Sequence, residues 1–254
     1  MTDTERPDGG TVDGSGGPLG NGRETDRPTR KPVDHRPSSV ASALAVALAA
    51  CSVALVATGP VQTRSILLVV AGVFVLGVGF RRREGLVPLI RFVLGLALVV
   101  AGIQLSIAAD LGRIGDAELL PGLYGLGVLG LGLLPVRRGW ETRLATLGVG
   151  LVLVSVLFSG ITRDGGLIGI LGATVAGIAA WDAARHAITL GEQVGRAGST
   201  ARTELVHVGA TGVVGVATIA ISVAVWRVQV TDLPLLALVF LLGAAVVLLL
   251  ALYD

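Results

Sequence analysis

The sequence predicts an all-α integral membrane protein, a bundle of about eight transmembrane helices with both termini in the cytoplasm. Eight long apolar stretches run between Val40 and Leu252, and the charged residues lie in the gaps between them. The 254 residues are 52% hydrophobic with a mean hydropathy of +0.79, which lies outside the range of ordinary soluble domains. The basic residues also alternate between gaps, which predicts how the bundle is oriented.

Each apolar stretch is predicted to cross the bilayer. Spanning a hydrocarbon core of ~30 Å takes about 20 apolar residues as a helix. A charge at the bilayer centre costs roughly 2.5–3.5 kcal/mol, so charge-free runs of this length favour transmembrane helices. The second and sixth runs are the shortest. The predicted spans are residues 40–58, 65–80, 92–109, 119–136, 144–161, 166–181, 205–226 and 233–252.

Arginine predicts the orientation. The N-terminal tail and every second gap hold 16 of the 20 basic residues, and the other gaps hold one arginine each. By the positive-inside rule, both termini are predicted to be cytoplasmic, in a multi-pass protein of the cell membrane. The net charge of +2 is then loop charge beside an anionic leaflet and does not indicate a nucleic-acid partner. The single arginines are Arg64, Arg113, Arg163 and Arg227.

Residues 1–38 are predicted to be a disordered cytoplasmic tail. They contain seven Gly, five Pro and thirteen charged residues, and little that a core can bury. Such a segment does not offset its own ordering entropy. An alternative concerns Cys51, the single cysteine, which follows Leu48-Ala49-Ala50 in the manner of a lipoprotein cleavage site. The apolar run continues beyond it, which favours an ordinary small residue inside a helix.

Glycine is predicted to pack helices together. Small residues four apart let two helix backbones approach closely. The sixth span carries Gly165, Gly169, Ala173 and Gly177, and the seventh carries Gly209, Gly212 and Gly215. We expect these two spans to be in contact, although the same ridge also suits self-association. Residues 72–79 and 125–132 resemble each other and both precede an arginine cluster, which suggests a duplicated helical hairpin.

One gap is longer and more patterned than the others. In residues 182–204, called the connector below, apolar and polar residues recur with helical periodicity, so that they would fall on opposite faces of a helix. We expect an amphipathic helix that continues the sixth span or lies at the interface, then turns at Gly198-Ser199. Its polar face is a candidate docking surface for a cytoplasmic protein. The candidate docking residues are Asp182, Arg185, His186, Glu192, Gln193, Arg196, Arg202 and Glu204.

The connector carries the motif Trp-Asp, Ala-Ile, Gly-Glu-Gln, Gly-Arg, Thr, Arg, Glu-Leu-Val-His. Its residues are Trp181, Asp182, Ala187, Ile188, Gly191, Glu192, Gln193, Gly195, Arg196, Thr200, Arg202, Glu204, Leu205, Val206 and His207. Over about residues 181–215, this motif resembles an uncharacterised family of haloarchaeal multi-pass membrane proteins. The resemblance is looser elsewhere and excludes the first 38 residues. It implies an association with MoxR-type AAA ATPases and their von Willebrand-like partners, and it implies no activity.

The connector also contains residue pairs that merit a chemical interpretation. Asp182 with His186, and Glu204 with His207, have spacings that place two ligands on one helix face, and a hairpin would bring both pairs together. The simpler interpretation is that Asp182 caps or solvates a helix end and that His207 lies at the membrane interface. Glu192 and Gln193 lack a companion nucleophile for acid–base work. We therefore expect no metal and no cofactor.

The interiors of the spans argue against several functions. They contain no Asp, Glu, Lys or Arg, whereas ion-coupled transporters place such residues in the membrane. Gln104 is the one strongly polar side chain deep in a span, and such a residue commonly bonds to a neighbouring helix. The sequence favours a non-enzymatic scaffold or assembly partner. Transport of an apolar or uncharged solute is the alternative, and intramembrane catalysis ranks below both.

Overall fold

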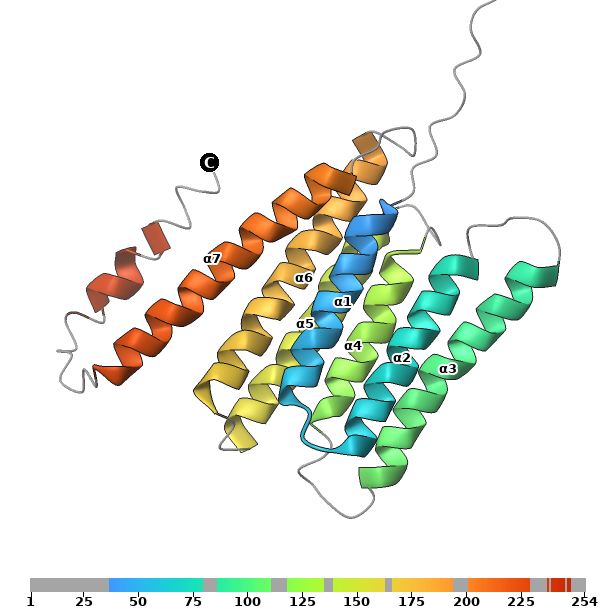
Figure 1. Cartoon of the computed structure of the whole chain (residues 1–254), viewed down its shortest axis with the longest axis horizontal. Coiled ribbons are helices and arrows are strands. Elements are labelled where there is room, and N and C mark those ends of the chain that lie inside the picture. The colour runs from blue at the N-terminus through green and yellow to red at the C-terminus, as the bar shows by residue number, and fades with distance from the viewer. Residues whose placement is uncertain are drawn as a thin grey trace, which may run out of the picture. The chain divides into compact units, whose positions relative to one another are not determined.

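The computed structural model describes residues 37–79, 86–110, 118–134, 139–162, 166–193 and 201–228, with 237, 239–244, 246 and 247. Every regular element in these residues is a helix, which confirms the all-α fold class. They belong to one compact unit, Asp34–Asp254. The helices are α1 (Ser39–Val56), α2 (Pro60–Gly79), α3 (Leu86–Asp110), α4 (Leu119–Gly132), α5 (Glu141–Thr162), α6 (Leu167–Gln193) and α7 (Ala201–Arg227) (Figure 1).

Six helices are long and apolar enough to cross a membrane, namely α1, α2, α3, α5, α6 and α7. Helix α4 is apolar but shorter, at 14 residues. These helices indicate a multi-pass membrane protein whose outer surface contacts lipid. The predicted eighth span, 233–252, lies only partly within the described residues, of which 239–244 are helical. Residues 1–36 of the predicted tail lie outside the described part of the chain.

Several helices extend beyond the apolar runs that predicted them. Helix α2 begins at Pro60 rather than at residue 65, and α3 begins at Leu86 rather than at residue 92. Proline is favoured in the first turn of a helix, where its missing N–H is not needed. Arg64 and Arg91 therefore belong to the first turns of α2 and α3, although both lie outside the apolar runs that predicted these helices. Hydropathy locates the part of a helix that lipid covers and leaves its ends undefined.

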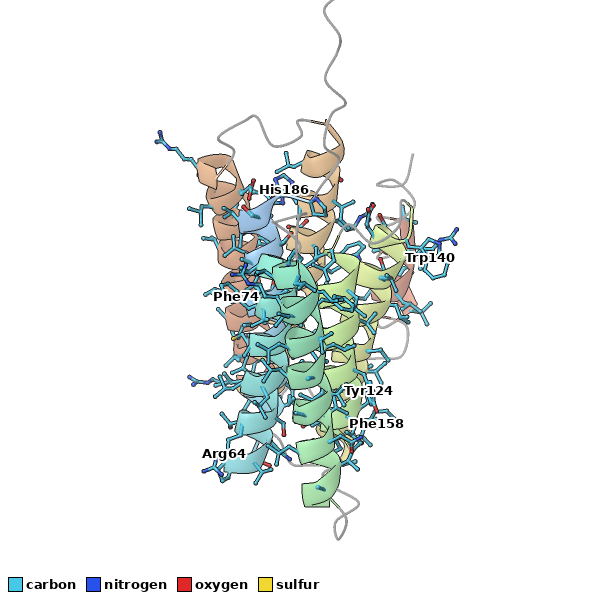
Figure 2. The ribbon with its side chains drawn as sticks, turned by 90° about the vertical axis from the view of Figure 1, so that its right-hand side faces the viewer. Arg64, Phe74, Tyr124, Trp140, Phe158 and His186 are labelled. Carbon is cyan, nitrogen blue, oxygen red and sulfur yellow. The ribbon has the colours of Figure 1, made fainter. Side chains whose placement is uncertain are left out.

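Successive helices run antiparallel, and α1 lies among the others (Figure 1). Its most extensive contacts are with α6, and it also touches α2, α4, α5 and α7. Helix α2 pairs with α3, and α4 pairs with α5. Trp140 and His186 lie toward one end of the bundle and Arg64 toward the other (Figure 2). Fully buried core side chains include Val53, Val69, Leu123, Leu126, Leu129 and Val152.

The two hairpins, α2–α3 and α4–α5, share one packing geometry. A Cβ atom on Gly72 would lie 2.6 Å from the carbonyl oxygen of Gly95, so the two backbones touch. A Cβ atom on Gly125 would lie 2.5 Å from the carbonyl oxygen of Gly148. Both residues of the second pair follow those of the first by 53 positions. This correspondence supports the duplicated hairpin that residues 72–79 and 125–132 suggest.

The same offset of 53 positions relates a second pair of contacts, between the start of the first helix and the later turns of the second helix in each hairpin. A Cβ atom on Gly102 would meet the carbonyl oxygen of Ser65, and Ser155 Oγ donates to the carbonyl oxygen of Glu118 at 2.8 Å. Ser155 and Glu118 again follow Gly102 and Ser65 by 53 positions. The match therefore extends along the length of each hairpin rather than resting on one glycine pair.

The small-residue ridge of α6 packs on α1 and α5. Ser52 of α1 donates to the carbonyl oxygen of Ala173 at 2.7 Å, and a Cβ atom on Gly177 would meet Leu153 of α5 at 2.7 Å. A Cβ atom on Gly169 would only touch the carbonyl oxygen of Leu55, at 3.8 Å. The ridge therefore faces α1 and α5 rather than α7, because α1 occupies that side of α6.

Helices α6 and α7 are in contact, as expected, and of the three predicted glycines of α7 only Gly215 lies at the contact. Gly215 of α7 lies against Val175 of α6. Cβ atoms on Gly209 and Gly212 would meet nothing within 4 Å. The fourth predicted ridge residue of α6, Gly165, lies outside the described residues.

Candidate functional site

The connector begins as a continuation of the sixth predicted span. Helix α6 runs without interruption to Gln193, so residues 182–193 are helical and residues 194–200 lie outside the described part. The part of the predicted apolar face that lies on α6 is buried against the bundle, with Ala184 and Ala187 fully inaccessible, whereas Leu205 of α7, predicted on the same face, is exposed. The candidate site therefore lies where α1 begins, α6 ends and α7 begins, called the connector end below.

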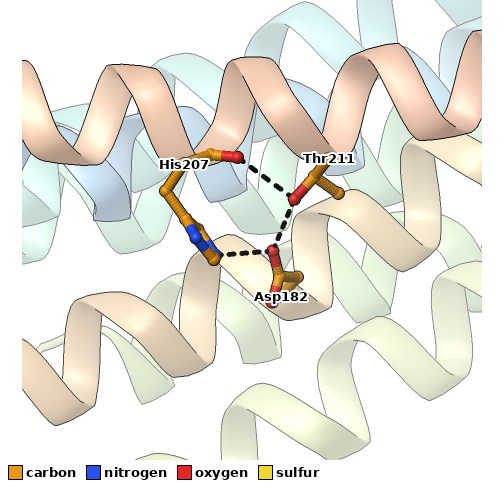
Figure 3. A network of polar contacts seen from close by, with 3 residues as sticks. All are labelled: Asp182, His207 and Thr211. Atoms are coloured by element: carbon orange, nitrogen blue, oxygen red, sulfur yellow. Dashed lines mark hydrogen bonds and ion pairs between the residues drawn. The ribbon is translucent and has the colours of Figure 1, made fainter.

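A polar network joins α6 to α7 at this end (Figure 3). Asp182 Oδ2 lies 3.0 Å from His207 Nε2 and accepts a hydrogen bond from Thr211 Oγ1 at 2.9 Å. Thr211 also reaches the backbone carbonyl of His207, one turn earlier in α7. Asp182 thus does not lie at a helix end, as the simpler interpretation expected, because α6 continues past it.

His186 adds a second contact between the same helices. Its ring stacks on that of His207, with centroids 4.4 Å apart and planes 15° from parallel. The Nε2 atom of His186 is buried and has no hydrogen-bond partner among the described residues. The hairpin does bring three of the four candidate metal ligands together. Within the described residues, however, no group of three metal-ligating side chains has suitable geometry.

In this geometry the two histidines do not converge on one point where a metal ion could lie. A histidine donates to a metal from a nitrogen lone pair in the plane of its ring. In two nearly parallel stacked rings, those lone pairs run side by side rather than converging on one point. One nitrogen, on His207, is also already directed at the Asp182 carboxylate.

The arrangement also differs from that of a hydroxyl-based catalytic triad. In a hydroxyl-based triad, the hydroxyl gives its proton to a histidine that a carboxylate orients. Here the carboxylate of Asp182 is the central group, and both His207 and the Thr211 hydroxyl point to it. The Thr211 hydroxyl therefore bonds to the carboxylate rather than to a histidine, and the network joins α6 to α7.

Glu204 lies in a different place from the other candidates. Its side chain is 1% exposed, and Oε2 accepts from Ser38 Oγ at 3.0 Å and from the backbone N–H of Ala41 at 2.8 Å. The first N–H groups of a helix have no partner inside the helix, and a carboxylate there is favoured by the helix dipole. Glu204 of α7 thus caps the start of α1.

Ser38 completes this junction of three helices. Its backbone N–H donates to the carbonyl oxygen of Ala187 in α6 at 3.0 Å, while its hydroxyl bonds to Glu204 in α7. The start of α1 is therefore fixed to both arms of the connector.

Two charged candidates face outward. Arg185 and Arg202 are exposed, and the Arg185 guanidinium lies 5.0 Å from the centre of the Trp181 ring. That distance suits a cation–π contact. Glu192 and Gln193 belong to α6 but their side chains are not described, and Arg196 lies outside the described residues.

Sequence reasoning missed Ser38, Ala41 and Thr211. Thr211 follows His207 by four positions, which is the spacing of neighbours on one helix face, so periodicity would have found it. Ser38 and Glu204 are separated by 166 positions and had no such local signal.

Comparison with known proteins places part of the chain in a protein family. The model of a family described as a family of unknown function (DUF7519) matches residues 107–249, from the last turn of α3 to the predicted eighth span. No curated protein and no solved structure matches the chain.

Proposed function

The chain belongs to the DUF7519 family of unknown function, and we propose that it is a non-enzymatic membrane scaffold or assembly partner. The proposed docking element is the connector, residues 182–204, which would face the cytoplasm. The matched region contains the whole connector, so this proposal concerns a part of the chain that the family shares.

The fixed geometry of the connector end supports the proposal most. Asp182 ties α6 to α7, and Glu204 ties α7 to the start of α1. Arg185 and Arg202 remain exposed on the two arms of this junction. A surface that is already ordered loses little conformational entropy when a partner binds, so such a platform suits docking.

The chemistry of the spans supports a non-enzymatic role. Ionisable groups placed inside the membrane are costly and mark ion pathways or catalytic sites. Glu118 and Glu204 lie at helix ends and Asp182 lies level with the first turns of α7, and the carboxylates or backbones of all three bond to neighbouring helices. Structural bonds of this kind suit a scaffold better than a reaction centre.

The proposed partner is a cytoplasmic protein with an acidic face, since the two exposed charged side chains among the described connector residues are arginines. The resemblance of the connector implies a MoxR-type AAA ATPase system as the partner class. By the positive-inside rule the connector end would lie in the cytoplasm, beside the anionic lipids of the inner leaflet.

Photocrosslinking in native membranes tests this function. A photoreactive residue at position 185 or 202 is expected to capture one cytoplasmic protein, which mass spectrometry then identifies. The Arg185→Ala/Arg202→Ala variant is expected to lose that protein in a pull-down. Arg143→Ala is the matched control, because Arg143 is also exposed and is predicted to lie on the same side of the membrane. Equal recovery of the partner by all variants would contradict docking at the connector.

The second candidate function is transport of an apolar or uncharged solute. The repeated hairpin favours it, because many transporters are built from internal repeats. Reconstituted vesicles would then show solute permeability that protein-free vesicles lack. In that case the Arg185→Ala/Arg202→Ala variant would keep its activity, since the connector arginines have no part in transport.

A further inference from the structure

The outer face of α3 carries a row of residues that includes three alanines and one amide. Helix α3 buries Gly95, Val99, Gly102 and Ser106 against its neighbours, and the opposite face is exposed. Along the centre of that exposed face, six residues recur at alternating intervals of four and three positions. We call them the α3 stripe: Ile90, Leu94, Ala97, Ala101, Gln104 and Ala108.

The α3 stripe is the line along which α3 would meet a helix packed on this face. Residues four and three apart form a continuous seam along a helix, as in the a and d positions of a coiled coil. Lipid-facing positions need no small residues, whereas helix–helix contacts in membranes are rich in them because they let backbones approach. Ala97, Ala101 and Ala108 place three small residues in the α3 stripe.

Gln104 is the second and independent feature of this face. Its amide is exposed and has no hydrogen-bond partner among the described residues. It lies six positions before Asp110, the last residue of α3, which places it about 9 Å inside that end at 1.5 Å per residue. Inside a bilayer, an amide facing lipid tails leaves its hydrogen bonds unmade, and a neighbouring helix would supply them.

We propose that a second copy of this chain docks on the α3 stripe, with α3 parallel to α3 about a two-fold axis. Two copies have the same orientation in a membrane, so a two-fold contact places identical residues opposite each other. An amide both donates and accepts, so Gln104 is complementary to Gln104 of the other copy. A partner of different sequence would need its own polar group at that depth. The interface lies on a different face from the connector and goes beyond the proposed docking function.

Disulfide crosslinking in native membranes tests the proposal. Cys51 is the single cysteine, so Cys51→Ser gives a background free of thiols. In that background, Ala97→Cys and Ala101→Cys are expected to form a crosslinked dimer under mild oxidation. The matched controls are Leu96→Cys and Val100→Cys, which are exposed at nearly the same depths but lie about 100° away around the helix. The controls are expected to remain monomeric.

Substitution of the amide provides a second measurement. Gln104→Leu keeps the size and removes the hydrogen bonds, so the dimerisation constant in detergent is expected to fall roughly 3- to 30-fold. Gln104→Asn keeps an amide and is expected to retain most of the association. A stable monomer in every variant would overturn the proposal, as would equal crosslinking of stripe and control positions. Crosslinking to a protein of another mass would overturn it in favour of a different membrane partner.

Discussion

Asp182 and His207 join helices α6 and α7 through a contact of 3.0 Å between Oδ2 and Nε2. The contact matters because α7 is loosely packed: 6% of its apolar window is buried, against 22–39% in the other long helices. A helix with so few apolar contacts depends more on its polar ones. Asp182 and Glu204 are therefore the residues from which the stability of the connector end is best tested.

Removal of the Thr211 hydroxyl is expected to loosen α7. Thr211→Val keeps the shape but takes away the bond to Asp182, which lies between two helices. Interhelical bonds in membranes contribute roughly 0.6–2 kcal/mol, so the midpoint of unfolding by sodium dodecyl sulfate should fall measurably. Thr218→Val is the matched control, because the Thr218 hydroxyl bonds only to its own helix, at Val214. Equal effects of the two changes would argue against the network.

Loss of the Glu204 carboxylate is expected to cost more than loss of the Ser38 hydroxyl. Glu204→Ala leaves the buried N–H of Ala41 without its acceptor, and an unmade buried bond costs roughly 1–3 kcal/mol. Ser38→Ala removes a donor and leaves the carboxylate its bond to Ala41. The free energy of unfolding in mild detergent measures both, and a greater loss in Ser38→Ala would contradict the capping role.

Much of the bundle was predictable because hydropathy is a local signal. Apolar runs located every described helix, and periodicity located the buried face of the connector around Ala184 and Ala187. The first residues of α2 and α3 were predicted too late along the chain, because each helix already includes polar interfacial residues, such as Arg91, before its apolar run begins. A hydropathy window does not register that continuation.

The candidate site was less predictable because its contacts join distant parts of the chain. The spacing of Asp182 and His186 in the sequence does suggest a shared face. Nothing local indicates that Glu204 caps α1 through Ser38, since the cap is supplied by another helix. The sequence likewise did not indicate which helix packs on the α6 ridge, because a small residue such as Ala173 allows any helix to approach. In the structure that helix is α1, which contacts Ala173 through Ser52.

The orientation of the bundle has a direct test. Trp140 and Arg64 are both exposed and lie at opposite ends (Figure 2). In the Cys51→Ser background, Arg64→Cys is expected to react with a membrane-impermeant maleimide in intact cells, since the positive-inside rule puts it outside. Trp140→Cys is expected to react only after permeabilisation. Labelling of residue 140 from outside would reverse the predicted topology and place the connector outside the cytoplasm.

The glycine pairs of the two hairpins predict equivalent effects at corresponding positions. Gly72→Ala and Gly125→Ala would each place a Cβ atom within 2.9 Å of backbone atoms in the facing helix. Backbone shifts of that kind cost roughly 1–3 kcal/mol, so both variants should unfold at a lower temperature in detergent, by similar amounts.

Gly77→Ala and Gly150→Ala are the matched controls, because a Cβ atom at either position would meet nothing within 4 Å. Alanine is a better helix former than glycine by about 1 kcal/mol, so these controls should be neutral or slightly stabilising. A large loss at Gly125 with none at Gly72 would show that the hairpins pack differently. The case for a duplicated unit, and with it the main support for transport, would then fail.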